Sequence, residues 1–209
     1  MMGIVSKFTI YILIFTSAFL LISCGKKYSP EYDRYIKSIE KERAEKDSIF
    51  GQTSDSPFAG DSNAKFHRLV YYDVNPGFVF KSRLTEYRNK DTVKVFGTKG
   101  EERKAVKYGY LKFNYSGAYY KLNMYKGFSK NGDEYFSIWF TDNTTGEETY
   151  GVGRYLDFEL NADPEYEYTI DFNKAYNPYC AYSARYSCAI PTKEDYINMA
   201  ITAGEKRFH

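Results

Sequence analysis

The sequence has few of the residues on which common metal sites depend. It contains two histidines, His67 and His209, three cysteines and one tryptophan. A zinc site needs four protein ligands, or three and a water molecule. Neither histidine is spaced from the cysteines as a metal ligand would be. The sequence therefore argues against a metal site, and we expect no cofactor.

Several catalytic motifs are also missing. The chain has no Gly-x-Ser-x-Gly nucleophile elbow, no phosphate-binding loop and no His-Glu-x-x-His motif. The segment from Gly151 to Arg154 contains two glycines but lacks the third glycine and the strand–helix setting of a dinucleotide site. We interpret that segment as a bend.

An excess of charge of one sign is missing as well. The chain has 29 Lys and Arg residues against 27 Asp and Glu residues, which gives a formal net charge of +2. Such a chain has no single-sign field with which to attract nucleic acid. We therefore expect no nucleic-acid partner.

The longest apolar run is too short for a membrane span. It extends from Phe8 to Ile22 behind Lys7, whereas a spanning helix needs roughly 20 apolar residues. A basic residue followed by a short apolar run is typical of a secretory signal peptide. The end of the run and the two residues after it, Leu21-Ile22-Ser23-Cys24, resemble the lipobox of bacterial lipoproteins.

The lipobox resemblance implies cleavage before Cys24, a diacylglycerol thioether on Cys24 and a further acyl chain, such as palmitate, on its amino group. Two or more chains anchor a protein stably in a membrane. Gly25 stands where many inner-membrane lipoproteins have a retention aspartate, which favours the outer membrane of the bacterial envelope. An ordinary signal peptide with a coincidental cysteine is the alternative.

The expected domain covers residues 30–209, after a signal peptide (1–23) and a tether (24–29). Ser29, Pro30 and Glu31 form a helix start, because serine caps free amides, proline fits the first turn and acid suits the helix dipole. We expect a helix over residues 30–50. A packing helix with a solvated charged face is preferred over a partner-binding helix.

From residue 67 onward the hydrophobic period changes to two, which predicts β-strands. Apolar side chains alternate with polar ones in five segments, and Ser116-Gly117, Asn131-Gly132 and Thr145-Gly146 mark turns. The alternating sets are Leu111/Phe113/Tyr115, Tyr120/Leu122/Met124, Phe136/Ile138/Phe140, Leu156/Phe158/Leu160 and Tyr168/Ile170/Phe172.

The expected fold class is therefore mainly β: an antiparallel meander of about eight strands over residues 67–173 that closes into a barrel or sandwich, with one N-terminal α-helix. Aromatic residues make up 19% of the chain. A sugar-binding surface is one interpretation of that richness, but the strand propensity of aromatic residues explains it more simply.

Residues 140–191 are unusually dense in polar, aromatic and turn-forming residues. The Thr-Gly, Thr-Tyr and Arg-Tyr-Leu stretch of residues 145–156, the run Asp171-Phe172-Asn173-Lys174-Ala175-Tyr176-Asn177-Pro178, the two later cysteines and residues 203–206 closely resemble the signature of DUF1684, a domain of unknown function. The resemblance extends from Pro30 to Lys206. Residues 189–191 depart from the family's more proline-rich ending. The resemblance implies a domain and no activity.

Cys180 and Cys188 remain after lipidation uses Cys24. An oxidising envelope and an even cysteine count favour a disulfide between them. A free-thiol pair or a metal site is the alternative. A redox role is disfavoured because it normally uses a tighter Cys-x-x-Cys spacing.

Two further sites are conceivable. Asp157 and Asp171, with Arg154 nearby, would supply an acid and a base for an envelope hydrolase if both faced one pocket. Their alternation with apolar neighbours instead favours the solvent face. A second set would line a polar ligand pocket at one end of the barrel, or satisfy the backbone of a buried loop. Its members are Arg154, Asn173, Tyr176, Asn177, Tyr179, Tyr182 and Arg185.

The sequence thus favours a lipid-anchored envelope protein whose β domain binds a small molecule or has a structural role. Its expected partners are the membrane, through the lipid on Cys24, and a small-molecule ligand. Enzyme or redox chemistry remains an alternative.

Overall fold

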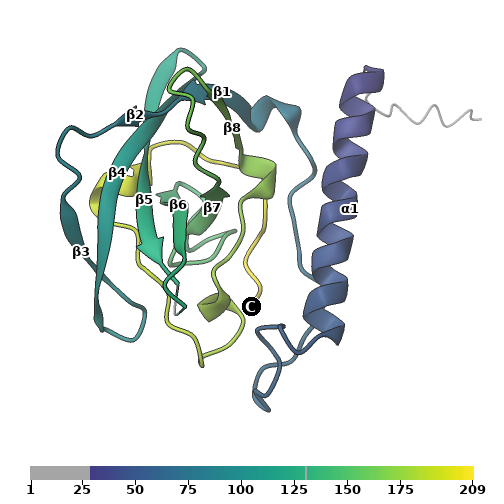
Figure 1. Ribbon diagram of the computed structural model, residues 1–209. Helices are drawn as coiled ribbons and strands as arrows, with labels where there is room; N and C mark the ends of the chain where they lie inside the picture. Colours follow the sequence, from purple (N-terminus) through teal and green to yellow (C-terminus); the bar gives the residue numbers. More distant parts are fainter. Residues whose placement is uncertain (1–28, 130) are drawn as a thin grey trace, which may run out of the picture.

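The computed structural model describes residues 29–129 and 131–209. In this part of the chain, one long helix stands beside a body of antiparallel strands (Figure 1). The signal peptide, the tether up to residue 28 and the proposed lipid site at Cys24 lie outside the described residues. No helix in the described ranges is long and apolar enough to cross a membrane.

Helix α1 (Pro30–Gln52) begins where the sequence predicts. Ser29 has an extended backbone, and its hydroxyl accepts a hydrogen bond from the amide of Tyr32 at 3.4 Å. The helix ends at Gln52, two residues beyond the expected end. Ile39 and Phe50 are its buried residues, so the helix packs on the domain as expected.

Nine strands form the body. They are β1 (Val79–Arg83), β2 (Thr85–Glu86), β3 (Thr92–Phe96), β4 (Glu102–Tyr115), β5 (Ala118–Phe128), β6 (Glu134–Asp142), β7 (Arg154–Phe158), β8 (Glu167–Asp171) and β9 (Tyr196–Ile197). Strands β4 to β7 form an antiparallel meander, with β2 and β3 pairing with β4. The short strand β9 pairs with β6 in parallel.

Strands β1 and β8 form a separate two-stranded antiparallel sheet. One core cluster joins its apolar side chains, such as Phe80 and Ile170, to those of the meander, such as Leu122 and Ile138. The fold is therefore mainly antiparallel β with one helix and a sandwich-like core. No closed barrel is found in the described ranges, because β1 and β8 pair with each other and not with the meander.

Most of the alternating residues face the core as predicted, with two differences. Leu160 lies beyond the end of β7 and is exposed, because the chain leaves the sheet after Phe158. Residues 67–75 form only one isolated bridge, at Tyr71, and a short 3₁₀ helix follows at Pro76–Phe78. The strands therefore begin at Val79 and not near residue 67.

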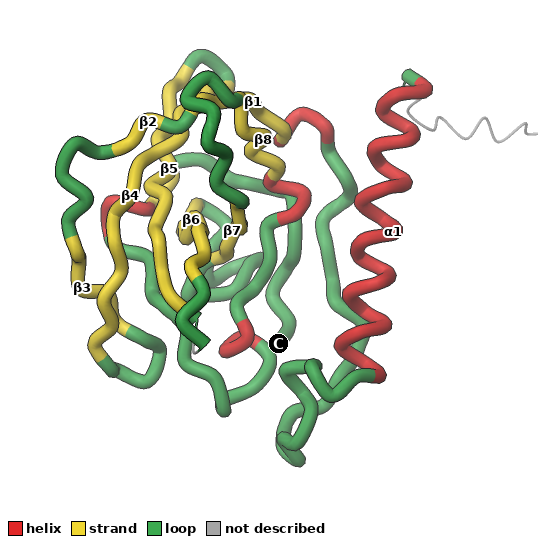
Figure 2. Tube along the Cα trace, viewed as in Figure 1, coloured by secondary structure: helices red, strands yellow, loops and turns green. Residues whose placement is uncertain are grey.

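The segment after β8 runs mainly as loops and short 3₁₀ helices, and the C-terminus lies between the body and the lower end of α1 (Figure 2). Phe208 packs in a small core with Phe50, Phe58 and Tyr182. This C-terminal segment and α1 therefore approach each other, and the space above their contact forms the main hollow of the described molecule.

Candidate functional site

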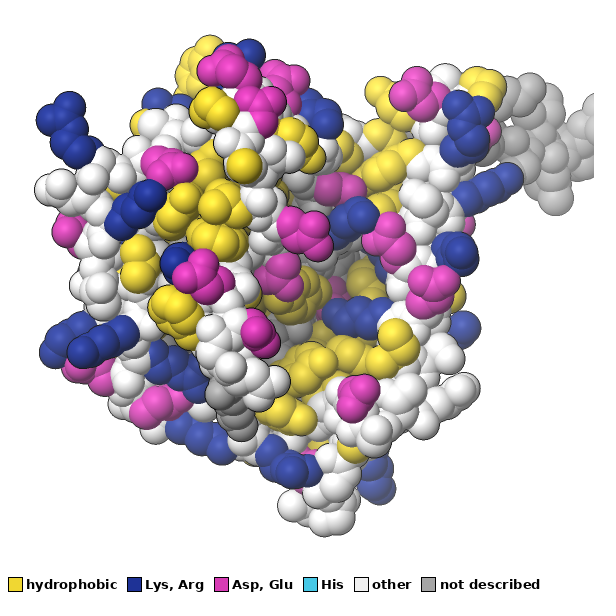
Figure 3. Space-filling model, viewed as in Figure 1, with side chains coloured by type: hydrophobic (Ala, Val, Ile, Leu, Met, Phe, Trp, Pro, Cys, Tyr) yellow, Lys and Arg dark blue, Asp and Glu magenta, His cyan; other side chains and the backbone are white. Residues whose placement is uncertain are grey.

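The main pocket lies between α1 and the β body and has a volume of about 600 Å³. Figure 3 shows the hollow beside the helix, with hydrophobic side chains on its floor and charged side chains in and around it. The lining comes from α1, the segment between α1 and β1, strand β7 and the chain after β8. Its members are Ile39, Glu42, Arg43, Lys46, Phe50, Tyr71, Tyr155, Asp157, Asn173, Lys174, Ala175, Tyr176, Pro178, Tyr179 and Cys188.

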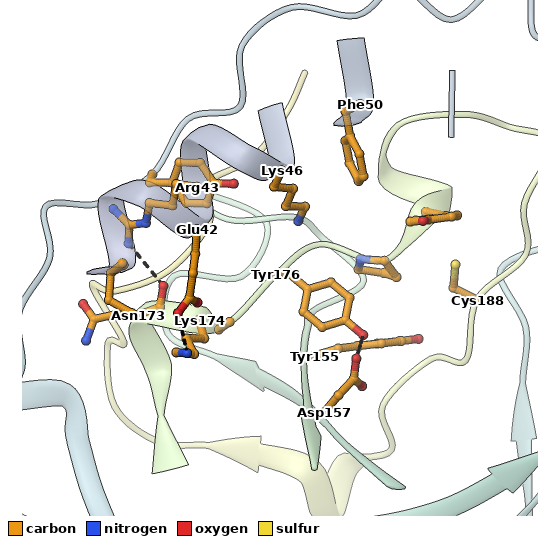
Figure 4. A pocket seen from close by; sticks show the side chains of 15 residues that line it. Glu42, Arg43, Lys46, Phe50, Tyr155, Asp157, Asn173, Lys174, Tyr176 and Cys188 are labelled. Carbon is orange, nitrogen blue, oxygen red and sulfur yellow. Dashed lines mark hydrogen bonds and ion pairs between the residues drawn. The ribbon is translucent and has the colours of Figure 1, made fainter. Parts of the chain in front are cut away.

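Helix α1 supplies one wall of the pocket. Ile39, Arg43, Lys46 and Phe50 follow at intervals of three or four residues, which places them on one face of a helix. Glu42 lies beside this face and forms an ion pair with Lys174 at 2.9 Å. Figure 4 shows these α1 side chains opposite those of the body.

Arg43 is a cation that forms no ion pair among the described residues. Its guanidinium donates to the backbone carbonyl oxygens of Tyr72 at 2.9 Å and Asn173 at 3.2 Å. The guanidinium also lies 4.4 Å from the centre of the Tyr71 ring. Its Nε and the Tyr71 hydroxyl have no hydrogen-bond partner within residues 29–129 and 131–209. Burial lowers the pKa of Arg43 from its usual value, yet an arginine stays charged. This wall of the pocket therefore has a positive charge that forms no ion pair with a described carboxylate, although Asp171 and Glu40 act on that charge from beyond ion-pair distance.

Lys46 is the second cation of the helix wall, and a buried carboxylate of the C-terminal segment holds its side chain in place. Its Nζ donates to the carboxylate of Glu205 at 2.8 Å and lies 5.2 Å from the centre of the Tyr176 ring. Glu205 is only 1% exposed, and it also accepts from Asn177 and from the Tyr182 hydroxyl. The network fixes the lysine ammonium against the aromatic floor.

Tyrosine rings form the floor of the pocket. Tyr155 and Tyr176 meet edge to face, with their ring centres 6.0 Å apart. The Tyr176 hydroxyl donates to Asp157 at 2.7 Å (Figure 4). Burial, followed by the charge of Asp157, raises the pKa of Tyr176. The phenol therefore stays protonated and offers a flat apolar face to an occupant of the pocket.

Two thiols lie at the far end of the pocket. Cys188 lines it, and the amide of Cys180 donates to the Cys188 sulfur at 3.2 Å. Both cysteines are free thiols in the structure. The chain therefore brings the two residues together, and a disulfide between them stays a prediction.

Comparison with known proteins places this geometry in a family. The family model described as "Protein of unknown function (DUF1684)" matches residues 64–206. The chain belongs to the DUF1684 family. The match begins after α1, so the family model covers less of the chain than the expected range from Pro30 to Lys206.

One solved structure has a fold similar to that of this chain. The solution NMR structure of an uncharacterised protein from Haloarcula marismortui has 28% sequence identity and a TM-score of 0.63. The similarity covers 84% of this chain and 96% of that chain. No curated protein matches the chain. The comparisons therefore establish the family and are consistent with an unassigned function.

Three of the seven ligand-pocket residues expected from the sequence line this pocket of the DUF1684 chain. They are Asn173, Tyr176 and Tyr179. The side-chain amide of Asn173 donates to Tyr35, Asp171 and the carbonyl of Asn75, so it also holds the loop together, as the alternative interpretation expected. Both interpretations of this segment thus apply to Asn173.

The other four expected residues lie elsewhere. Arg154 is 1% exposed and pairs with Asp142 at 2.6 Å; it was expected in the pocket, but the chain beyond β9 covers it. Asn177 is fully buried and donates to Glu205. Tyr182 and Arg185 line a separate hollow, and the Tyr182 ring packs edge to face on Phe50 of α1 with the ring centres 5.3 Å apart.

The expected hydrolase set is not assembled in the DUF1684 fold. Asp157 and Asp171 both line a second, smaller hollow of about 390 Å³ beside the pocket, but Arg154 does not line it. Asp171 is buried and accepts from the Tyr35 hydroxyl at 2.9 Å, so it is not on the solvent face. Asp157 is exposed, as the solvent-face interpretation predicted. The three residues therefore do not share one hollow.

Sequence reasoning missed the contribution of α1. Arg43 and Lys46 were assigned to a solvated charged face, yet both line the pocket. The spacing of Tyr35, Ile39, Arg43, Lys46 and Phe50 was the signal that could have identified them, because these positions share one helix face. A charged residue within an apolar stripe indicates a polar contact with the packed domain.

Proposed function

We propose that this protein is a lipid-anchored component of the bacterial envelope that binds a small amphipathic anion in the pocket between α1 and the β body. The anchor would be the lipid on Cys24. The ligand would have an apolar or aromatic body and one anionic group. The observation that carries this proposal is the unpaired Arg43 guanidinium on the wall of a pocket with an aromatic floor.

The volume of the pocket supports a small ligand. Pockets for small molecules commonly have about 300–1,000 Å³, mostly apolar walls and a few placed polar groups. This pocket has about 600 Å³. Tyr155, Tyr176, Tyr179 and Phe50 supply faces and edges of aromatic rings, against which an acyl chain or a planar ring packs well.

The charges of the lining favour an anion. Lys174 is neutralised by Glu42 and Lys46 by Glu205, whereas Arg43 binds only carbonyl oxygens. A guanidinium presents donors in a fork that matches a carboxylate or phosphate. A bound anion would therefore complete the charge balance of this wall.

A pair of probes that share one acyl chain and differ in charge tests the proposal. Decanoate and methyl decanoate share an acyl body and differ in charge, and the binding of each is measured by isothermal titration to the purified protein. We expect decanoate to bind and the Arg43→Met variant to bind it about 10- to 100-fold more weakly, since a charge-assisted hydrogen bond contributes about 1.5–3 kcal/mol. The affinity for the ester should change little.

Two variants control for indirect effects. Arg43→Lys keeps the charge and should retain part of the preference for decanoate. Lys41→Met removes an exposed charge from the same helix and should leave both affinities unchanged. Equal loss of both probes in Arg43→Met, or no binding of either probe to the wild type, would contradict the proposed ligand class.

A further inference from the structure

Cys180 and Cys188 form a contact that the binding proposal does not use. They are eight positions apart in sequence, yet the fold brings the amide of Cys180 within 3.2 Å of the Cys188 sulfur. Cys180 lies in the 3₁₀ turn Tyr179–Ala181, and Cys188 lies in the returning strand-like segment beside β3. Both residues are partly exposed.

Neighbouring groups hold each cysteine in place. The backbone of Cys188 is bonded to Thr98 in both directions, through its amide at 3.2 Å and its carbonyl at 3.0 Å. The Tyr150 hydroxyl contacts the Cys180 carbonyl at 3.2 Å and the Cys180 sulfur at 3.7 Å. The two cysteines are therefore held by hydrogen bonds to two other segments of the chain, at Thr98 and at Tyr150.

The surroundings distinguish the two thiols. Hydrogen bonds from the Cys188 thiol, Tyr150 and Thr98 lower the pKa of Cys180 to about 6, against its burial. The same contact and burial raise the pKa of Cys188. The other titratable groups that act on the two thiols are Tyr135, Tyr155 and Arg103. Near neutral pH, Cys180 is a thiolate beside a protonated Cys188.

The position of Cys188 gives the cysteines access to a small molecule. Cys188 lines the main pocket and also a smaller hollow beside Trp139. A molecule that enters either space reaches the Cys188 thiol, beside which the partly exposed Cys180 lies. A purely structural disulfide has no need of an opening to a pocket.

We propose that Cys180 and Cys188 are a reversible dithiol–disulfide site that exchanges with disulfides of low molecular weight. Cys180 is the attacking thiolate and Cys188 the resolving thiol. This redox activity goes beyond the proposed ligand binding and does not depend on it.

The exchange has two steps. The Cys180 thiolate attacks one sulfur of a disulfide R–S–S–R, forms the Cys180–S–S–R mixed disulfide and releases RS⁻, which takes the proton of Cys188. The Cys188 thiolate then attacks the Cys180 sulfur and displaces the second RS⁻. The protein loses two electrons and one proton, the small disulfide is reduced to RSH and RS⁻, and total charge is conserved.

The test uses the full mature chain with Cys24→Ser, in which Cys180 and Cys188 are the only thiols. The reduced protein is mixed with hydroxyethyl disulfide at pH 7 and followed by intact mass. We expect the wild-type pair to form an internal disulfide that dithiothreitol reverses without denaturant. Adding Cys188→Ser should trap a stable mixed disulfide of Cys180 with 2-mercaptoethanol, because no second thiol remains to resolve it. The serine hydroxyl can still donate to the Cys180 thiolate before the attack.

The reverse variant is the matched control. With Cys180→Ser, the remaining thiol at Cys188 should form its adduct at least about threefold more slowly at pH 7, since fewer molecules hold the thiolate. Equal rates for the two single-cysteine chains would overturn the assigned roles. A wild-type disulfide that dithiothreitol reduces only after unfolding would overturn the proposal in favour of a structural bridge.

Discussion

Arg154 shows how one buried side chain can define the structure around a site without entering it. Its guanidinium donates to Asp142 and to the carbonyl oxygens of Ile201 and Ala203. These contacts connect β7 to the end of β6 and to the C-terminal segment. Arg154 therefore positions the C-terminal segment, and through Glu205 it indirectly supports Lys46.

Replacement of Arg154 should be strongly destabilising. Arg154→Met leaves the Asp142 carboxylate buried without its cation, and breaking a buried pair in this way costs about 3–5 kcal/mol. The measurement is the free energy of unfolding in urea. Lys41→Met, which breaks an exposed pair with Glu45, should change that free energy by less than about 1 kcal/mol. Comparable effects of the two changes would contradict the role given to Arg154.

The Cys180 thiol should show an unusual pH profile. With a pKa of about 6 against the ordinary value of 9.0, its thiolate is already formed at neutral pH. In the Cys24→Ser/Cys188→Ser chain, alkylation by iodoacetamide should level off above about pH 7, since the thiolate is the reactive form. In the Cys24→Ser/Cys180→Ser chain, the rate should continue to rise toward pH 9. A rate at Cys180 that also rises toward pH 9 would contradict the assignment of a hydrogen-bonded thiolate at neutral pH.

The site was only partly predictable at this scale. Tyr176 and Tyr179 were identified because a dense polar and aromatic segment follows a strand. Arg154 was misplaced because sequence neighbours do not reveal which chain segment covers a side chain. Arg43 and Lys46 were missed because charged residues on a helix usually face solvent, and only the docked position of α1 turns them inward.

At the scale of elements, helix α1 stands apart from the sheets but is held to the domain by its buried face. Ile39 is 1% exposed and Ile49 is 48% exposed on the same helix. Among the polar contacts of the helix, those from Tyr35 to Asp171 and from Lys46 to Glu205 reach buried carboxylates. The wall of the pocket therefore depends on how the helix packs.

Truncation of the two isoleucines should separate packing from helix propensity. Ile39→Ala removes a buried side chain and should lower the free energy of unfolding by about 2–5 kcal/mol. Ile49→Ala makes the same chemical change at an exposed position and should cost less than about 0.5 kcal/mol. Chemical denaturation followed by Trp139 fluorescence measures both. Similar values for the two variants would mean that α1 is not docked as described.

Local signals predicted the elements better than their assembly. The Ser116-Gly117 turn has positive φ at both residues, 50° and 82°, and it joins β4 to β5 in the register that a two-residue hairpin requires. The pairing of β1 with β8 joins residues some ninety positions apart, and no local pattern encodes such a contact. The separate two-stranded sheet could therefore not be predicted from the sequence, although a sandwich was one of the two expected folds.

At the scale of the whole molecule, the proposed lipid on Cys24 would hold the domain close to a membrane. The described chain begins at Ser29, only a few residues after Cys24. A tether of this length would place α1 and the pocket near the membrane surface, where amphipathic anions such as free acyl carboxylates concentrate. The proposed anchor would thus bring the pocket close to its proposed ligands.

Removal of the lipid acceptor tests the anchor. Cys24→Ser should move the protein from the membrane fraction to the soluble periplasmic fraction and abolish labelling by radioactive palmitate, because at least two acyl chains are needed for stable attachment. Cys180→Ser is the matched control and should remain labelled in the membrane fraction. A Cys24→Ser protein that stays with the membrane would contradict lipid anchoring.

The central claim is that the pocket holds a small amphipathic anion, and native mass spectrometry of protein released gently from its own envelope tests it most directly. The account predicts an extra mass on the wild-type chain, lost in Tyr176→Ala and retained in Tyr119→Ala, whose ring is 82% exposed and remote from the pocket. The released compound should ionise as an anion. A bare wild-type chain, or a mass retained equally by both variants, would contradict the claim.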